Sequence, residues 1–170
     1  MMTKTTRRLL VAASAVCGAL VIAQPAAAQS ASDTFPVQAT VVANCNIDTP
    51  NTLQFGNYDP AVVNAATDLD ADTDIDVRCT KNSPGVTVEL DPGLNDNAGQ
   101  RRMTDGTEFL DYDLFQDAGR TAAWGAGVDA QGYTPTTSAW TSLTVYGRVP
   151  AGQNVGVGTY DDTVTATINF

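Results

Sequence analysis

The chain has 170 residues and a mass of 17.8 kDa, which suits one domain of ordinary size. It carries 9 basic and 19 acidic side chains, a net charge of −10, which disfavours binding to nucleic acid or to anionic membrane surfaces. Histidine is absent, which excludes Ser-His-Asp and Cys-His catalysis and His-ligated zinc. The sequence contains no recognisable nucleophile–base pair or metal-ligand cluster, so we expect neither an enzyme nor a bound cofactor or metal.

The N-terminal segment has the pattern of a secretory signal peptide. Three basic residues within the first eight positions precede an apolar run over residues 9–23. That run is short for a membrane span of about 20 residues, and small residues suited to signal peptidase follow it. We predict a signal peptide over residues 1–28, cut between Ala28 and Gln29, with an uncleaved anchor helix as the alternative. Cleavage leaves 142 residues with 6 basic and 19 acidic side chains, a net charge of −13.

Two cysteines, Cys45 and Cys79, remain after the signal peptide has removed Cys17. In an oxidising compartment we expect them to form a disulfide, with a pair of free thiols as the alternative. Closing this loop would stabilise the fold by roughly 4 kcal/mol in the chain-entropy model. Metal binding by the pair is disfavoured, because neither cysteine has a second cysteine or a histidine nearby.

The mature chain alternates apolar and polar residues with a period of two, which indicates β-strands. The predicted strands cover residues 35–47, 74–79, 86–90, 110–115, 143–149 and 160–170. Turn sequences such as Asp91-Pro92-Gly93 separate them, and no helical stripe is present after the signal peptide. Short strands at this spacing predict an all-β fold, an antiparallel β-sandwich.

The first predicted strand is too long for the domain. Phe35, Val37, Ala39 and Val41 share one face, and the same alternation continues to residue 47. Such a strand would extend roughly 40 Å at about 3.3 Å per residue, whereas a compact domain of this size is about 37 Å across. Either the strand contains a bulge, or its first part leaves the domain and buries its apolar face elsewhere.

The last predicted strand reaches the C-terminus. One of its faces carries five apolar side chains, those of Tyr160, Val164, Ala166, Ile168 and Phe170. The terminal carboxylate should therefore lie at the end of a sheet, where a partner can reach it.

An aspartate stripe precedes the second cysteine, at every second position from Asp68 to Asp76. Its spacing is similar to that of a calcium loop, but Thr73 replaces the required glycine and Cys79 the required glutamate. We interpret it as a solvated strand face that discourages edge pairing, with a cation site as the alternative. For Trp124 and Trp140 we favour a role in the core or in loop support over stacking on sugars.

Taken in order, these segments resemble the spore coat protein U domain family, which includes the subunits of archaic chaperone-usher pili. The residues that carry the resemblance are Phe35-x-Val37 through Cys45, Phe55-Gly56-x-Tyr58, Cys79-Thr80, Leu110-x-Tyr112-x-Leu114-Phe115-x-Asp117, Trp124-Gly125, Val145-Tyr146-Gly147-Arg148 and Gly158-Thr159-Tyr160-Asp161-Asp162-Thr163. They span nearly all of the mature chain. Phe115 stands where a tyrosine is common in the family.

The resemblance implies an incomplete immunoglobulin-like sandwich whose missing strand leaves a groove. A periplasmic chaperone would fill the groove until the N-terminal extension of the next subunit replaces it at the outer-membrane usher. Residues 29–41 would then be the donated strand, with Phe35, Val37, Ala39 and Val41 entering the groove. Residues 42–170 would form the sandwich, and the apolar face of the C-terminal strand would border the groove.

The function implied is that of a secreted pilus subunit. It would polymerise by donor-strand exchange and act at the cell surface in adhesion and biofilm formation. The alternative from another class is a self-contained coat or carbohydrate-binding protein whose N-terminal strand folds back on its own sheet.

Overall fold

The computed structural model describes residues 27–49 and 51–170, in two units that divide between Ala39 and Thr40. The predicted signal peptide lies outside the described residues except for its last two positions, and Gln29 after the predicted cut is exposed. None of the described residues belongs to a helix long and apolar enough to cross a bilayer. The first strand begins at Cys45, and described residues 27–44 are neither helix nor strand.

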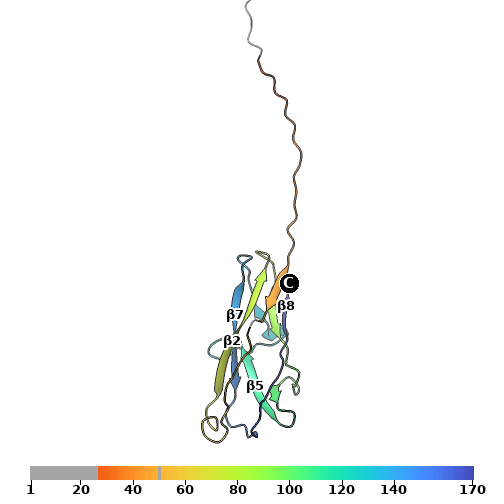
Figure 1. The fold of residues 1–170 in the computed structure, drawn as a ribbon. Helices are drawn as coiled ribbons and strands as arrows, with labels where there is room; N and C mark the ends of the chain where they lie inside the picture. The colour runs from red at the N-terminus through yellow and green to blue at the C-terminus, as the bar shows by residue number, and fades with distance from the viewer. Residues whose placement is uncertain (1–26, 50) are drawn as a thin grey trace, which may run out of the picture. The chain divides into compact units, whose positions relative to one another are not determined.

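The residues from Thr40 onward form two antiparallel sheets (Figure 1). The larger sheet has five strands, in the order β1 (Cys45–Asp48), β2 (Leu69–Cys79), β7 (Thr141–Val149), β5 (Phe109–Phe115) and β4 (Arg101–Thr104). The smaller sheet has three strands, in the order β6 (Gln131–Gly132), β3 (Thr87–Leu90) and β8 (Ala166–Asn169). A single turn of 3₁₀-helix, η1 (Gly127–Asp129), precedes β6. The predicted all-β antiparallel class is confirmed.

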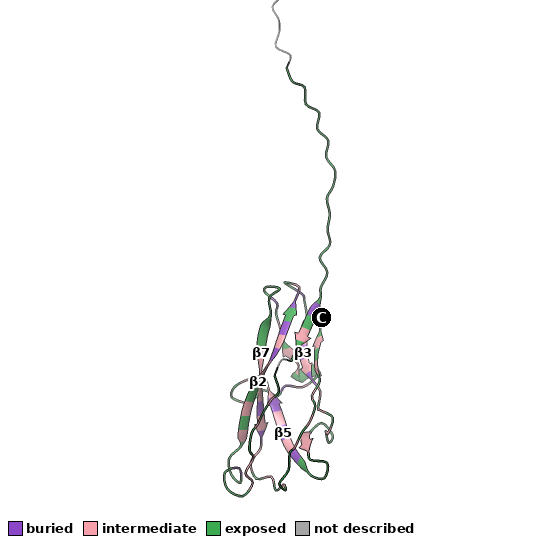
Figure 2. Cartoon of the chain, in the orientation of Figure 1, coloured by how far each residue is buried: buried purple, intermediate pink, exposed green. Residues whose placement is uncertain are grey.

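Strand alternation places the core between the sheets, as Figure 2 shows for buried positions on β2 and β5. On β2, Ile75 and Val77 are buried while the intervening aspartates face outward. Trp124 is fully buried in the core, and its indole N–H donates to the Val88 carbonyl at 2.9 Å. Trp140 remains half exposed, with the guanidinium of Arg78 4.5 Å above its ring. The prediction that tryptophan fills the core is thus met by Trp124.

Two predicted strands are several residues longer than those observed. The one over residues 35–47 begins only at Cys45 in β1, and Pro36, which has no N–H to donate, lies in the part that forms no strand. The one over residues 160–170 is reduced to β8, because its first half forms only an isolated bridge, from Asp161 to Thr104 of β4, and otherwise pairs with a loop. In that half Thr165 and Thr163 accept from the Asp91 and Leu94 amides at 3.0 and 3.2 Å.

Two short strands, β4 and β6, have no alternating pattern and were not predicted. Strand β4 carries Arg101, whose guanidinium donates to the carbonyls of Asp91, Leu90 and Trp124, each at 3.0 Å. Burial lowers the pKa of Arg101, but these three carbonyls hold the charged group in place. A charged residue can therefore sit in a strand at the margin of the core, which a hydrophobic pattern does not reveal.

Candidate functional site: an open groove in the sandwich

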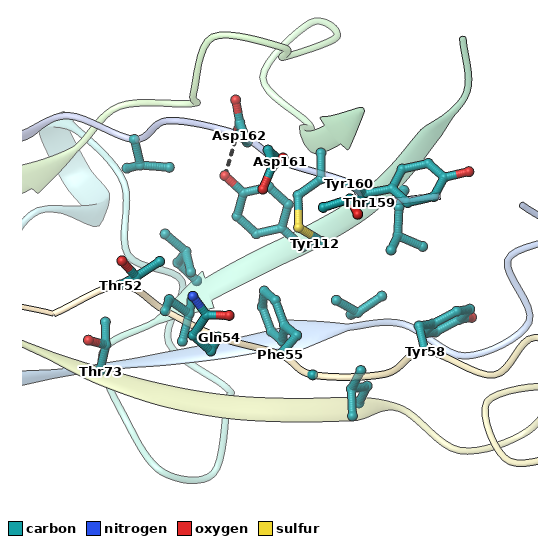
Figure 3. A pocket seen from close by; sticks show the side chains of 18 of the residues that line it. Thr52, Gln54, Phe55, Tyr58, Thr73, Tyr112, Thr159, Tyr160, Asp161 and Asp162 are labelled. Carbon is teal, nitrogen blue, oxygen red and sulfur yellow. Dashed lines mark hydrogen bonds between the residues drawn. The ribbon is translucent and has the colours of Figure 1, made fainter. Parts of the chain in front are cut away.

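A groove of about 990 Å³ opens between the two sheets and reaches the hydrophobic core (Figure 3). Its floor consists of buried core side chains, namely Leu90, Leu110, Tyr112, Leu114, Val145 and Val149. One wall is residues 51–58, which follow β1, and the other is residues 155–166, which lead into β8. The groove therefore reaches down to side chains of the core along one side of the domain.

The first wall, residues 51–58, is held by side-chain packing. Leu53 and Phe55 pack on the core, and the Phe55 ring centroid lies 6.1 Å from that of Tyr112. A β-carbon on Gly147 of β7 would lie 2.7 Å from Leu53 and 2.8 Å from Phe55, so only glycine permits this close packing. Tyr58 closes the end of the wall, its hydroxyl donating to the Pro150 carbonyl at 3.0 Å.

Both walls present unpaired backbone groups to the groove. Within the described part of the chain, the backbone of residues 52–57 makes no hydrogen bond. In the second wall Thr163 and Thr165 turn their carbonyls toward residues 91–94. Because peptide groups alternate in direction along an extended chain, Val164 between them turns toward the groove, and no described residue pairs with its backbone. Unpaired backbone beside a groove that reaches the core is a template for an added strand.

A hydrogen-bonded pair, Tyr112 and Asp162, fixes the second wall over the floor. The Tyr112 hydroxyl donates to Asp162 at 2.7 Å, and the other carboxylate oxygen accepts from the Leu94 and Asn95 amides at 3.0 and 3.2 Å. Burial, reinforced by the Asp162 carboxylate, raises the pKa of Tyr112, so the phenol stays a neutral donor. Gly93 has φ +84°, and a β-carbon there would clash with Asp162. These contacts therefore have a structural role, which is to hold the second wall in place.

Some of the predicted site residues line the groove, and others do not. Of the predicted groove-edge residues, Tyr160, Val164 and Ala166 line the groove, Ile168 packs against the core, and Phe170 is exposed. The proposed donor side chains lie in residues without secondary structure, and they are exposed: Phe35, Val37, Ala39 and Val41. The first wall was missed by sequence reasoning, although the spacing Leu53-x-Phe55 is that of one strand face.

The aspartate stripe follows the outer face of β2, and one of its members, Asp74, also borders the groove. Asp70 receives two hydrogen bonds from Arg148, at 2.8 and 2.9 Å, and Arg120 lies 2.7 Å from Asp72. Thr144 donates to Asp74 at 2.8 Å, and Ser142 donates to Asp76. Among the described residues no group of three or more acidic, cysteine or histidine side chains could hold a metal ion. The stripe is therefore a paired outer face, with arginines and hydroxyls from other strands and loops supplying the partners.

This pairing predicts a specific pH dependence. Hydrogen bonds from Arg148 lower the pKa of Asp70, with the charges of Arg120 and Arg148 adding to the effect and burial opposing it. A depressed folded-state pKa stabilises the protein above the unfolded pKa of 3.8, and that contribution is lost as the pH falls through the folded value. Because the pair is partly exposed, Arg148→Gln should lower the free energy of unfolding by only about 0.5–1 kcal/mol at pH 7. Urea unfolding should show this difference shrinking as the pH falls below 3.8 and vanishing below the folded-state pKa of Asp70; a difference that stays constant as the pH falls would contradict the assignment.

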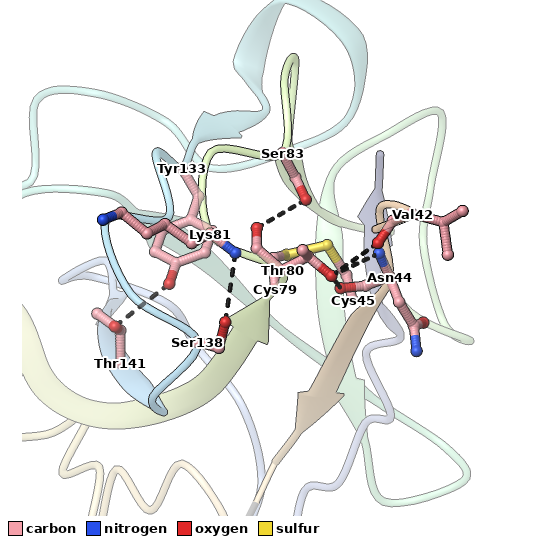
Figure 4. Close-up of a disulfide and its surroundings, with 10 residues drawn as sticks. All are labelled: Val42, Asn44, Cys45, Cys79, Thr80, Lys81, Ser83, Tyr133, Ser138 and Thr141. Carbon is pink, nitrogen blue, oxygen red and sulfur yellow. Dashed lines mark hydrogen bonds between the residues drawn. A yellow bond between two sulfur atoms is a disulfide. The ribbon is translucent and has the colours of Figure 1, made fainter. Parts of the chain in front are cut away.

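The disulfide lies at the opposite end of β1 from the first groove wall. Cys45 and Cys79 are direct partners in the β1–β2 ladder, with their α-carbons 4.1 Å apart, and both are buried (Figure 4). Both side chains face inward, as the alternation predicts, and the predicted disulfide is confirmed. It ties β1, the strand that follows the N-terminal extension, to its neighbour β2 in the larger sheet.

Comparison with known proteins agrees with this architecture. Residues 31–167 match the Spore Coat Protein U domain. The chain belongs to that family. The family resemblance predicted from the ordered motifs is thus confirmed over most of the mature chain.

Two relatives illustrate the family and its fold. The chain is 40% identical to "Protein U" of Myxococcus xanthus over 177 aligned positions, which cover 94% of this chain and 96% of the relative. It is similar, with a TM-score of 0.53 and 27% identity, to a chain in the CsuC–CsuE chaperone–tip adhesion subunit pre-assembly complex from archaic chaperone-usher Csu pili of Acinetobacter baumannii. That alignment covers 77% of this chain and 40% of the chain in the complex.

Proposed function

We propose that this protein is a secreted structural subunit of the chaperone-usher pilus type that polymerises by donor-strand exchange. The observation that carries the proposal is the groove, whose floor consists of core side chains and whose walls include backbone, at residues 52–57 and Val164, without a partner in the described part of the chain. An added strand would cover the floor with side chains and satisfy the wall backbone with ladder hydrogen bonds. No catalytic constellation in the described residues competes with this interpretation.

The proposed occupant is the N-terminal extension of a second copy, residues 29–41. Its apolar side chains alternate, so a strand formed from it presents one apolar face, carrying Phe35, Val37, Ala39 and Val41. The three largest of these are more than 80% exposed in the unassembled chain, which leaves them available for burial. An extension that enters the groove of a neighbour makes a heterologous contact, and repetition of that contact gives an open filament.

A periplasmic chaperone would occupy the groove before assembly, and an outer-membrane usher would be the site of exchange. The similarity to a chain from a chaperone–subunit complex supports this order of events. The predicted signal peptide supports export, and the filament would then lie at the cell surface, where adhesion and biofilm formation follow from its position. The net charge of −13 would keep exported subunits apart until a strand is exchanged.

Deleting residues 29–41 from the mature chain tests the proposal. The full mature chain should form multimers that resist SDS until they are heated, because release requires a completed core to open. The deletion variant should form none, yet it keeps the groove and should shorten the multimers of the full chain when the two are mixed. Equal multimers from both chains would contradict the proposal, as would a full chain that remains a stable monomer, the behaviour of a self-contained coat protein.

A further inference from the structure

The residues just before β1 are attached to the end of β2 by Thr80 (Figure 4). The Thr80 amide donates to the Asn44 carbonyl at 2.8 Å, and the Asn44 amide donates to the Thr80 hydroxyl at 3.2 Å. That hydroxyl in turn donates to the Val42 carbonyl at 3.1 Å. Since Cys45 and Cys79 are the preceding pair in the ladder, these bonds extend the β1–β2 pairing beyond the end of the strand.

In this continued pairing, the side-chain hydroxyl of Thr80 takes the place of the Thr80 backbone carbonyl. The chain turns after Thr80, and its carbonyl accepts instead from the Ser83 amide at 3.1 Å and the Ser83 hydroxyl at 2.8 Å. Asn82, at φ +62°, completes the turn. In a regular antiparallel pair that carbonyl would accept from the opposite amide. Because a hydroxyl can accept one hydrogen bond and donate another, the Thr80 side chain also bonds to Val42, two residues before Asn44.

These contacts matter because an extension can enter the groove of its own domain. The first groove wall, residues 51–58, follows β1 directly, so self-insertion requires the chain to reverse direction between Val42 and Cys45. Length does not prevent it, since thirteen extended residues span about 43 Å. A tethered segment also has an effective concentration of about a millimolar, far above that of a second copy in solution. Exchange between copies therefore needs a feature that opposes the reversal.

We propose that Thr80 is a positioning residue that keeps the root of the extension extended and so directs the strand to a second copy. A reversal between Val42 and Cys45 would rotate the Val42 carbonyl and the Asn44 amide away from the Thr80 hydroxyl and break the bonds that it makes with them. The bonds are thus compatible with donation and incompatible with self-insertion. This inference rests on the proposed donor-strand function. It adds a reason why the extension enters the groove of another copy and not the groove of its own domain.

A pair of variants of the mature chain tests this role. Thr80→Val removes both hydroxyl bonds with little change of shape, whereas Thr80→Ser keeps them. After refolding at about 1 µM and about 100 µM, Thr80→Val should leave roughly ten times more monomer than the wild type, at either concentration. Hydrogen exchange should show the amides of residues 37–41 protected in that monomer, because the extension then occupies its own groove. Thr80→Ser should behave as the wild type.

A second variant, Val42→Gly with Ala43→Gly, leaves Thr80 in place and makes the reversal easier at two exposed positions. It should also increase the amount of monomer whose residues 37–41 are protected. This variant tests the proposal if Thr80→Val does not fold. Unchanged multimers with unprotected amides in these variants would overturn the role of Thr80 while leaving donor-strand exchange intact. A protected wild-type monomer would also overturn it. Absence of multimers from every chain, with unprotected amides, would overturn the proposed function and this inference with it.

Discussion

Replacing Val37 by aspartate should abolish assembly of the mature chain, whereas replacing its neighbour Gln38 by aspartate should leave assembly nearly intact. The two residues lie on opposite faces of the proposed donor strand, so only the first would be buried in the groove of the next copy. An ionised carboxylate without a partner in an apolar groove costs several kcal/mol, and each 1.4 kcal/mol corresponds to a factor of ten in affinity. We expect the affinity between copies to fall at least about 100-fold for Val37→Asp.

The comparison isolates burial from charge, because both variants add the same negative charge one residue apart. Val37 is 85% exposed in the unassembled chain, so the substitution should leave the thermal stability of the monomer unchanged. Sedimentation velocity or SDS gels of unheated samples measure the multimers directly. In a mixture with wild type, the Val37→Asp chain should still accept a strand and therefore end growing filaments. Equal loss of assembly in both variants would show that charge, and not burial, is responsible.

Removing the disulfide should destabilise the domain strongly. Cys45→Ala with Cys79→Ala opens a loop with a sequence separation of 34, which in the chain-entropy model lowers the free energy of unfolding by about 4 kcal/mol. A domain of this size has a total stability of about 5–15 kcal/mol, so the loss is a large fraction. Urea titrations of the oxidised wild type and of the double variant measure the difference.

Reductant supplies the matched control for this prediction. It should destabilise the wild type to about the level of the double variant and should have no effect on the variant itself. The same reduction should also weaken assembly, since Cys45 opens the strand that joins the extension to the larger sheet. A wild type whose urea midpoint is insensitive to reductant, once reduction has been verified by thiol titration, would contradict the assigned contribution.

Elements with a clear alternation were predictable because the pattern itself encodes which face is buried. The predicted strand over residues 110–115 is observed as β5, one residue longer, and that over residues 143–149 as the C-terminal part of β7. The same rule placed both cysteines inward. Strand β4 could not be predicted from alternation because Arg101 occupies an inner position, where carbonyls from three residues stabilise its guanidinium. Those acceptors come from parts of the chain that no local pattern connects to β4.

The candidate site divides in the same way. The alternating N-terminal extension and the apolar face of residues 160–170 can be identified in the sequence, because each is a local pattern. The groove between residues 51–58 and 155–166 cannot, since its walls are about a hundred residues apart in the chain and meet only after both sheets have packed. The pairing of Asp70 with Arg148, 78 residues away, likewise depends on the β2–β7 register.

What the sequence determined by itself is therefore what local periodicity and ordered motifs carry: an all-β fold, two inward-facing cysteines, one family, and an apolar extension before the first strand. Tertiary structure alone decided that a groove reaches the core along one side, that residues 52–57 and Val164 find no backbone partner among the described residues, and that the Thr80 hydroxyl reaches Val42. The physical reason is that periodicity assigns each side chain to a face, whereas hydrogen-bond partners are set by which distant segments pack together.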